Sequence, residues 1–339
     1  MENNTNTATN TAKTVWDPAE KKLFGRSVDF INWGVLLYLG VVFFISTCCV
    51  VVYLIIAMVI AAANRELNSP DSYNTLVDSI LKTDGGMIAG VICGSAVMIL
   101  FMMKRVKPKE IFAKQKKMTI PAFLSLLFIF MSIQLPTMIL FDLGEKLLNM
   151  LGLSAESAME AATANSDSLL MMAYVGFFAP FFEEFIFRGF TMKAYNKLGC
   201  GKLLPIIVSA ALFGIMHGNP VQILFAFAVG LVLGYTAMEY GIIWSILIHF
   251  LNNFIFGDIA TIVFGKMPEP IGDIAEIVMF AEFFVAGIIA LIINRKKIAA
   301  YIKENTCDKK YFLRAFCSIP LMIFTAICLL EALLLIQKA

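Results

Sequence analysis

The chain has 339 residues, of which 59% are hydrophobic and only 15% are charged, and its formal net charge is +2. Soluble domains contain about 45–50% apolar and about 25% charged residues, so this composition excludes an ordinary water-soluble fold. The small net charge by itself says nothing about partners, and we expect no nucleic-acid ligand. The length is sufficient for several membrane-spanning helices of about 20 residues each.

The N-terminal segment is polar and rich in Asn and Thr, which indicates disorder over residues 1–15. We expect a polar, partly disordered tail over residues 1–29, ahead of the first apolar run. That run is too long for a cleavable signal peptide. The seven cysteines form no CxxC pair and five lie in apolar stretches, so we interpret them as small buried hydrophobic residues.

Long apolar runs follow, and each is a candidate membrane helix. The first is long enough to tilt or to extend past the bilayer. The fifth is short, and the ninth contains Pro320 and Glu331, so its status as a full span stays open. We predict an all-α, polytopic transmembrane helical bundle with eight or nine spanning helices. The runs cover residues 34–63, 86–103, 119–141, 169–198, 203–217, 221–240, 242–265, 274–293 and 315–336.

The positions of Lys and Arg orient this bundle, because cytoplasmic connections carry an excess of both. If the helices alternate and the N-terminus is inside, 22 of the 27 Lys and Arg residues lie on the inner side. The opposite orientation would reverse that ratio, so we predict a cytoplasmic N-terminus. The membrane-embedded bundle would cover residues 30–293. Residues 294–339 would form a basic cytoplasmic loop and an additional C-terminal membrane helix.

The fourth run carries charges near its middle, where the sequence FFEEFIFR surrounds Glu183, Glu184 and Arg188 with aromatic residues. A charge near the bilayer centre costs at least about 2.5–3.5 kcal/mol, so these residues are functional candidates. Glu184 and Arg188 are four positions apart, on one helix face, which predicts an ion pair. Glu183 faces elsewhere and is desolvated with less relief from the cation. That environment suits a general base.

The two histidines also lie in or at the end of apolar runs. His217 follows Phe213 by four positions, and His249 precedes Asn253 by four. A His/Asn pair on one helical stripe can donate hydrogen bonds to an oxyanion. Asn252 is about 100° away around the helix and is expected to face a neighbouring helix. Each feature alone could be structural: the Glu–Arg pair as an ion pair within one helix, a histidine as a packing residue, and an asparagine as a hydrogen-bonding residue between helices. Their occurrence in consecutive apolar segments favours one shared site.

The motifs Glu-Glu-x-x-x-Arg, Phe-x-x-x-His and His-x-x-x-Asn, in this order, resemble the signature of one family. It comprises the CAAX proteases and bacteriocin-processing enzymes, also called CPBP, ABI or Rce1-like intramembrane glutamic endopeptidases. The resemblance covers about residues 169–265, the predicted catalytic core. It implies hydrolysis of a peptide bond by an activated water, without a covalent acyl-enzyme and without a cofactor.

The resemblance also implies roles for individual residues. Glu183 would be the base and His217 its partner, while His249 and Asn253 would form the oxyanion site. The residues expected to support them structurally are Glu184, Arg188 and Phe213. The implied partners are the lipid bilayer and a membrane-associated or lipidated peptide or protein, in CAAX processing, bacteriocin processing or immunity. A short, polar N-terminus suits a multi-pass protein of the bacterial plasma membrane.

One geometric conflict accompanies these roles. Counted from Lys202, His217 lies about 21 Å along its helix, near the outer surface. Glu183 is instead expected in the middle or the inner half of the membrane. For the two side chains to meet, the fifth helix must tilt, start deep, or end within the membrane beside Gly218 and Pro220, which is permitted where the helix end lines a wet cavity.

Three alternatives from the sequence stay open. A zinc protease could use Glu183, His217 and His249 as ligands, since two histidines and one carboxylate suffice for a catalytic zinc. A proton-coupled transporter could relay protons through the same acidic and imidazole groups. The third alternative is a catalytically inactive membrane scaffold, because a family fold does not guarantee activity.

Overall fold

The computed structural model describes residues 16–64, 70–81, 85–113, 115–156, 158 and 169–339. The disorder predicted over residues 1–15 lies outside these ranges. The described residues are almost entirely helical, apart from a two-stranded antiparallel sheet that pairs β1 (Leu153–Ser154) with β2 (Gln337–Lys338). The predicted all-α helical bundle is therefore confirmed.

Among the described residues, seven helical segments are long and apolar enough to cross a membrane, or eight if one bent pair counts as a single span. The chain is thus a multi-pass integral membrane protein. The bent pair is α16 (Lys309–Phe316) with α17 (Ile319–Leu334), which meet at 60°. The seven segments are α1 (Pro18–Ala63), α3 (Gly85–Met102), Ile120–Met150 with α5 (Ile120–Met131) and α6 (Gln134–Met150), Leu169–Asn196, α12 (Pro220–Glu239), Ile242–Gly265 and α15 (Ile271–Asn305).

The fifth predicted run forms a helix that is too short to span. This helix, α11 (Leu203–Met216), has 14 residues, so it is about 21 Å long against a hydrocarbon core of about 30 Å. It ends because Gly218 adopts a positive φ of 54°, a conformation that glycine reaches without a steric penalty. Asn219 then caps α12 by accepting a hydrogen bond from the Val221 N–H at 2.9 Å. The described helices therefore do not reach the upper prediction of nine spans.

Two boundaries differ from the prediction, because α1 and α15 extend through polar sequence beyond the apolar runs. α1 begins at Pro18 rather than near residue 30, and the Asp17 carboxylate caps it by accepting from the Ala19 N–H at 3.4 Å. α15 continues to Asn305, so residues 294–305 are helical and not a loop. That stretch contains no Gly or Pro and is rich in Ala, Lys and Ile, which allows the helix to continue.

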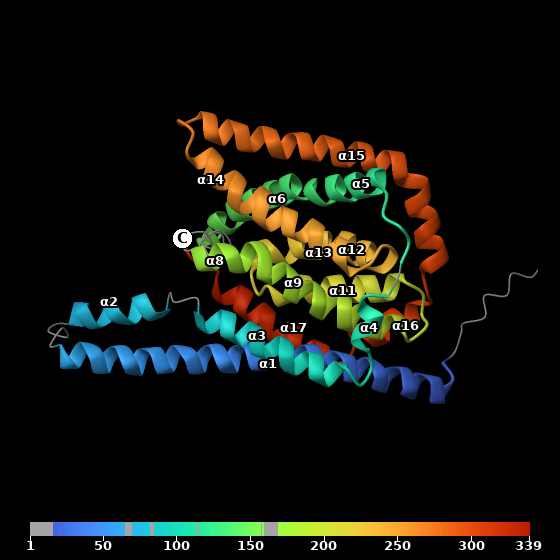
Figure 1. Ribbon diagram of the computed structural model, residues 1–339, viewed down its shortest axis with the longest axis horizontal. Coiled ribbons are helices and arrows are strands. Elements are labelled where there is room, and N and C mark those ends of the chain that lie inside the picture. Colours follow the sequence, from blue (N-terminus) through green and yellow to red (C-terminus); the bar gives the residue numbers. More distant parts are fainter. Residues whose placement is uncertain (1–15, 65–69, 82–84, 114, 157, 159–168) are drawn as a thin grey trace, which may run out of the picture.

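The helices run roughly along one common direction (Figure 1). α11, α12 and the site helices lie in the middle of the bundle, between α1 and α3 on one side and α5, α6 and α15 on the other. α1 packs along α3 and α17, and α5 packs along α15. Two short helices, α2 (Pro70–Leu81) and α4 (Pro108–Ile111), complete the described connections.

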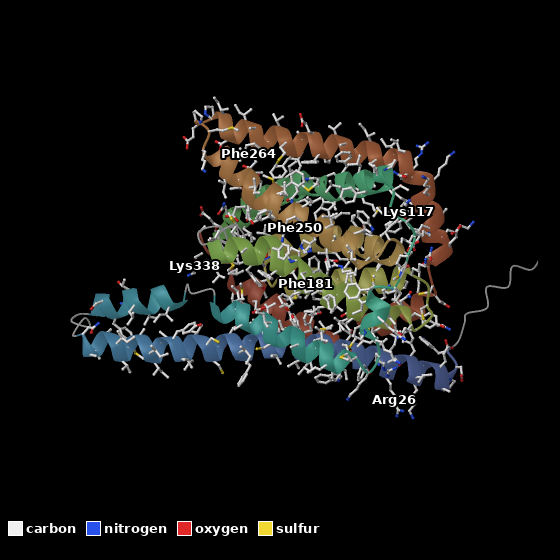
Figure 2. The ribbon with its side chains drawn as sticks, in the orientation of Figure 1. Arg26, Lys117, Phe181, Phe250, Phe264 and Lys338 are labelled. Carbon is white, nitrogen blue, oxygen red and sulfur yellow. The ribbon has the colours of Figure 1, made fainter. Side chains whose placement is uncertain are left out.

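The segments rich in Lys and Arg gather at one end of the bundle, as the alternating topology predicts. Lys116 and Lys202 both contact the carboxylate of Glu239 at 2.6 Å. At the same end, Arg314 pairs with Asp29 at 2.7 Å. Figure 2 shows Arg26 and Lys117 at this end and Lys338 at the opposite one.

Candidate active site

The helices that carry the first and third motifs alternate between α-helical and π-helical turns. Leu169–Asn196 consists of α8 (Leu169–Ala173), η2 (Tyr174–Phe178), α9 (Ala179–Glu184), η3 (Phe185–Thr191) and α10 (Met192–Asn196). Ile242–Gly265 consists of α13 (Ile242–Phe250), η4 (Leu251–Ile259) and α14 (Ala260–Gly265). π-helical turns are rare and occur frequently at functional sites. Both acidic residues and His249 lie within two residues of the start of such a turn.

Glu184 and Arg188 form the ion pair that their spacing predicts. Both side chains are 0% exposed, and Nη1 of Arg188 donates to Oε1 of Glu184 at 2.7 Å. The guanidinium also donates to the backbone oxygen of Gly230 at 3.4 Å and lies over the ring of Phe213, 4.1 Å from its centroid. Because opposite charges and a π face surround it, the cation is compensated within the bundle.

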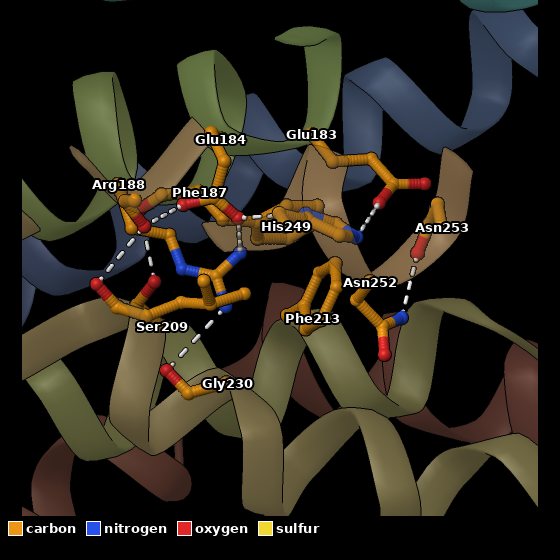
Figure 3. A network of polar contacts seen from close by, with 12 residues as sticks. Glu183, Glu184, Phe187, Arg188, Ser209, Phe213, Gly230, His249, Asn252 and Asn253 are labelled. Carbon is orange, nitrogen blue, oxygen red and sulfur yellow. Dashed lines mark hydrogen bonds and ion pairs between the residues drawn. The ribbon is translucent and has the colours of Figure 1, made fainter. Parts of the chain in front are cut away.

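Glu184 makes two further contacts that the sequence did not reveal. Its Oε2 accepts a hydrogen bond of 2.5 Å from Ser245, and its Oε1 accepts one of 3.2 Å from Nδ1 of His249 (Figure 3). Ser245 precedes His249 by four positions, so a shared helix face was an available signal. Glu184 therefore orients the His249 ring in addition to pairing with the arginine.

His249 lies between the two adjacent acids. While its Nδ1 faces Glu184, its Nε2 lies 3.8 Å from Oε2 of Glu183, and Figure 3 shows the Glu183 carboxylate directed toward this ring. The distance exceeds that of a direct hydrogen bond. The Glu183 side chain is 18% exposed, unlike the fully buried Glu184. Of the two adjacent acids, Glu184 thus forms the ion pair with Arg188, and Glu183 does not.

Two tyrosines from separate helices surround Glu183. The phenol groups of Tyr38 on α1 and Tyr174 on η2 lie within electrostatic range of the Glu183 carboxylate. Both tyrosines are buried. No spacing rule connects Tyr38 to the site, because α1 reaches it only through the tertiary fold. The tertiary fold therefore brings phenol groups from two separate helices into the electrostatic surroundings of the carboxylate.

His217 lies near the same group of residues, beside the Phe213 ring. Its Nδ1 donates to the backbone oxygen of Phe213 at 2.8 Å, which leaves Nε2 with the lone pair in the neutral ring. The Phe213 ring meets the imidazoles of His217 and His249 edge to face, with centroids 4.9 and 5.8 Å apart. His217 is also within electrostatic range of Glu183 and His249.

The depths of Glu183 and His217 agree, which resolves the conflict noted in the sequence. His217 lies about 21 Å along α11 from Leu203, at 1.5 Å per residue. Glu183 lies about 20 Å before Asn196, where its helix ends. Asn196 and Leu203 are joined by a short connection at the same end of the bundle. The fourth helix is thus long enough to place Glu183 as deep as the end of the short α11.

Asn253 takes part in a different set of hydrogen bonds. Its Nδ2 donates to the backbone oxygen of Val175 at 3.0 Å, and its Oδ1 accepts from Nδ2 of Asn252 at 2.8 Å (Figure 3). Asn252 in turn accepts from Gln134 of α6 at 2.8 Å. Asn252 therefore faces a neighbouring helix, as predicted. The structure brings Glu183 and both imidazoles together, whereas Asn253 bonds to Val175 and Asn252 rather than to either histidine.

The alternative zinc site would need Glu183, His217 and His249 to converge on one ion. Within the described ranges, no three His, Cys, Asp or Glu side chains converge as ligands of one ion. The alternative set of Glu183, His217 and His249 is therefore not preformed. Both Nδ1 atoms are directed to protein oxygens, Phe213 for one ring and Glu184 for the other.

Comparison with known proteins supports the resemblance that the motifs suggested. Residues 165–255 match the model of the Rce1-like family, described as type II CAAX prenyl endopeptidase Rce1-like. No curated protein and no solved structure matches the chain. The matched segment extends from the start of the Glu-Glu-x-x-x-Arg helix through Asn253, and so it includes all three motifs. Over residues 165–255, this multi-pass membrane protein is therefore similar to the Rce1-like family.

Proposed function

We propose that the chain is an intramembrane endopeptidase that hydrolyses a peptide bond with a water activated by Glu183. The observation that carries this proposal is the difference between the contacts of the two adjacent acids. Glu184 is held by Arg188, Ser245 and His249. Glu183 is partly exposed and lies 3.8 Å from the other nitrogen of the same imidazole. One carboxylate supports the site, and the other is available for chemistry.

In the proposed reaction, Glu183 accepts a proton from a water molecule, and the water oxygen attacks the carbonyl carbon of the peptide bond. The lone pair on Nε2 of His217 helps to hold that water. When the carbon–nitrogen bond breaks, the proton passes from Glu183 to the leaving amine. The water oxygen remains in the new carboxylate, and no covalent acyl-enzyme forms.

His249 and Asn253 would stabilise the oxyanion. Because Nδ1 of His249 faces the Glu184 carboxylate, that nitrogen carries a hydrogen. For Nε2 to donate to the oxyanion, the ring must carry a hydrogen on each nitrogen. The carboxamide of Asn253 uses one hydrogen for Val175 and has a second to donate.

Removal of either oxyanion donor should reduce turnover. We expect His249→Ala and Asn253→Ala each to lower kcat by about 10²–10³-fold, the effect of losing one such donor. KM should change little, because the donated hydrogen bonds strengthen only as negative charge develops. Steady-state kinetics of the purified variants measure both quantities. An effect confined to KM would contradict the oxyanion role.

We further propose a lipidated peptide or protein as the substrate class and the bilayer as the medium through which it reaches the site. The matched family is described as a prenyl endopeptidase. The site helix also presents exposed apolar rings, with Phe177 at 58% and Phe181 at 42% exposure. We propose that the basic end of the bundle faces the cytoplasm of a bacterial cell, since Lys and Arg gather there.

The proposed function can be tested with the chain in lipid nanodiscs and a quenched fluorescent peptide that ends in a farnesylated CAAX tail. We expect release of the last three residues, and slower release from the same peptide without the farnesyl group. Equal rates would contradict the lipidated substrate class. Proton-coupled flux in liposomes without cleavage would favour the transporter alternative, and the absence of both would favour the scaffold.

Chelation separates the proposed mechanism from the zinc alternative. We expect peptide cleavage to persist after exhaustive dialysis against EDTA, because the proposed base and oxyanion donors are protein groups. Zinc added back should give no increase. Cleavage that disappears on dialysis and returns with stoichiometric zinc would contradict the proposed mechanism.

A further inference from the structure

Three side-chain amides form a continuous chain of hydrogen bonds beside the site. Nε2 of Gln134 donates to Oδ1 of Asn252 at 2.8 Å, and Nδ2 of Asn252 donates to Oδ1 of Asn253 at 2.8 Å. Nδ2 of Asn253 donates to the backbone oxygen of Val175 at 3.0 Å. The chain thus connects α6, η4 and η2, three elements that are distant in the sequence. We call it the amide relay.

The direction of the amide relay is set at its Val175 end. A backbone carbonyl oxygen can only accept, so the NH2 group of Asn253 must face Val175 and its oxygen must face Asn252. Asn252 must then present its NH2 group to Asn253 and its oxygen to Gln134. If any one amide were flipped, two donors or two acceptors would face each other. The Val175 oxygen therefore sets the orientation of all three amides, and the hydrogen bonds from Asn252 and Gln134 hold the Asn253 carboxamide in that orientation.

The relay lies in a largely buried part of the bundle, where a polar group without hydrogen-bond partners lowers stability. Asn252 is only 8% exposed, and Gln134 is half-buried on a spanning helix. A buried amide without hydrogen-bond partners is strongly destabilising. Simple interhelical adhesion would need only one such pair. This network instead continues through Asn252 to the residue that carries the third motif.

We propose that Gln134 and Asn252 are positioning residues that hold the Asn253 carboxamide with its NH2 group toward the peptide bond being cleaved. This inference rests on the proposed function, because it assigns the relay to the oxyanion step. With Oδ1 held by Asn252 and one hydrogen held by Val175, the second Nδ2 hydrogen remains for the oxyanion. Neither positioning residue needs to touch the substrate.

Two variants interrupt the relay in different ways. Asn252→Asp replaces the donor that faces Asn253 with an acceptor, which favours the flipped carboxamide. Gln134→Met removes the distal donor while keeping a side chain of similar length. We expect each variant to lower kcat on the farnesylated CAAX peptide by about 10–100-fold, the range for a misplaced catalytic group. KM should stay near that of the unmodified chain, and kcat is compared at a temperature at which thermal unfolding shows each variant to be folded.

The matched control is Asn294→Asp, which makes the same change on spanning helix α15. Nδ2 of Asn294 donates only within its own helix, to the Ala290 oxygen at 2.9 Å. We expect this variant to retain normal kcat. If it lost as much activity as Asn252→Asp, the effect would come from the added carboxylate itself and the relay would be refuted.

A double-mutant cycle distinguishes positioning from a structural role. In the Asn253→Ala background, Gln134→Met should cause no further decrease in kcat, because the residue through which it acts is absent. The same fold-decrease in both backgrounds, or a normal kcat for Gln134→Met alone, would overturn the inference. Glu183→Gln is assayed in parallel. If Glu183→Gln is inactive and Gln134→Met has a normal kcat, only the relay is refuted. If the unmodified chain itself cleaves no peptide, the proposed function is refuted as well.

Discussion

Glu183→Gln should lower peptide cleavage by about 10²–10⁴-fold, the contribution of a positioned general base. Gln has nearly the shape of Glu but cannot take up the proton of the attacking water. The substitution should leave folding intact, because Glu183 is partly exposed and its Oε2 lies 3.8 Å from Nε2 of His249, too far for a direct hydrogen bond. Initial rates in nanodiscs and the unfolding temperature of the same preparation measure the two effects separately.

The matched control for this prediction is Glu282→Gln. Glu282 lies on spanning helix α15, outside the site, so the change removes a carboxylate from a membrane helix without touching the proposed chemistry. We expect normal cleavage from that variant. Normal cleavage by Glu183→Gln would show that another group acts as the base.

Glu184→Gln should act mainly on stability, by about 3–5 kcal/mol, the range for removing one partner of a buried ion pair. Arg188 is 0% exposed and would face a neutral amide in place of the carboxylate whose oxygen now lies 2.7 Å from its Nη1. Thermal unfolding in one detergent should show a clear decrease relative to the unmodified chain. An unchanged unfolding temperature would contradict the role of this ion pair in stabilising the fold.

The double variant Glu184→Gln/Arg188→Met provides the control for the stability effect of this ion pair. It removes both charges together, so much of the lost stability should return, as found for buried pairs replaced by apolar groups. Cleavage should nevertheless stay low, because His249 would still lack the carboxylate that faces its Nδ1. Full recovery of both stability and cleavage would show that Glu184 has no role beyond pairing.

The features that depend on local spacing were predictable. The sixth apolar run, expected over residues 221–240, forms α12 over Pro220–Glu239. The four-residue spacing of Glu184 and Arg188 gave the correct ion pair. Hydrophobic runs and i, i+4 contacts follow from helix geometry alone, and the membrane leaves the backbone few alternatives to a helix.

The features that depend on packing between helices were not predictable from spacing. The contact of Gln134 with Asn252 joins residues 118 positions apart. The π-helical turns are equally non-local in origin. At one crossing of η2 and η4, a Cβ atom added to Gly176 would lie 2.8 Å from Asp258 and Phe254, so the two helices approach closely only because this residue is glycine. No periodicity in either segment indicates that approach.

The apparent conflict in depth between Glu183 and His217 had a related cause. Apolar runs locate a helix along the membrane normal only to within several residues, since polar sequence continues the helix at either end. α11 is short and ends at Gly218, whereas the fourth helix continues to Asn196. Only the relative placement of these two ends could show that the carboxylate and the imidazole lie at one level.

The central claim is that Glu183 activates a water whose oxygen enters the product. It is tested most directly by incubating membranes that contain the chain, or its Glu183→Gln variant, in ¹⁸O-labelled water and identifying new C-termini by mass spectrometry. We expect new C-terminal carboxylates that carry one ¹⁸O atom with the unmodified chain and none with the variant. Identical sets of labelled termini from both preparations would contradict the account.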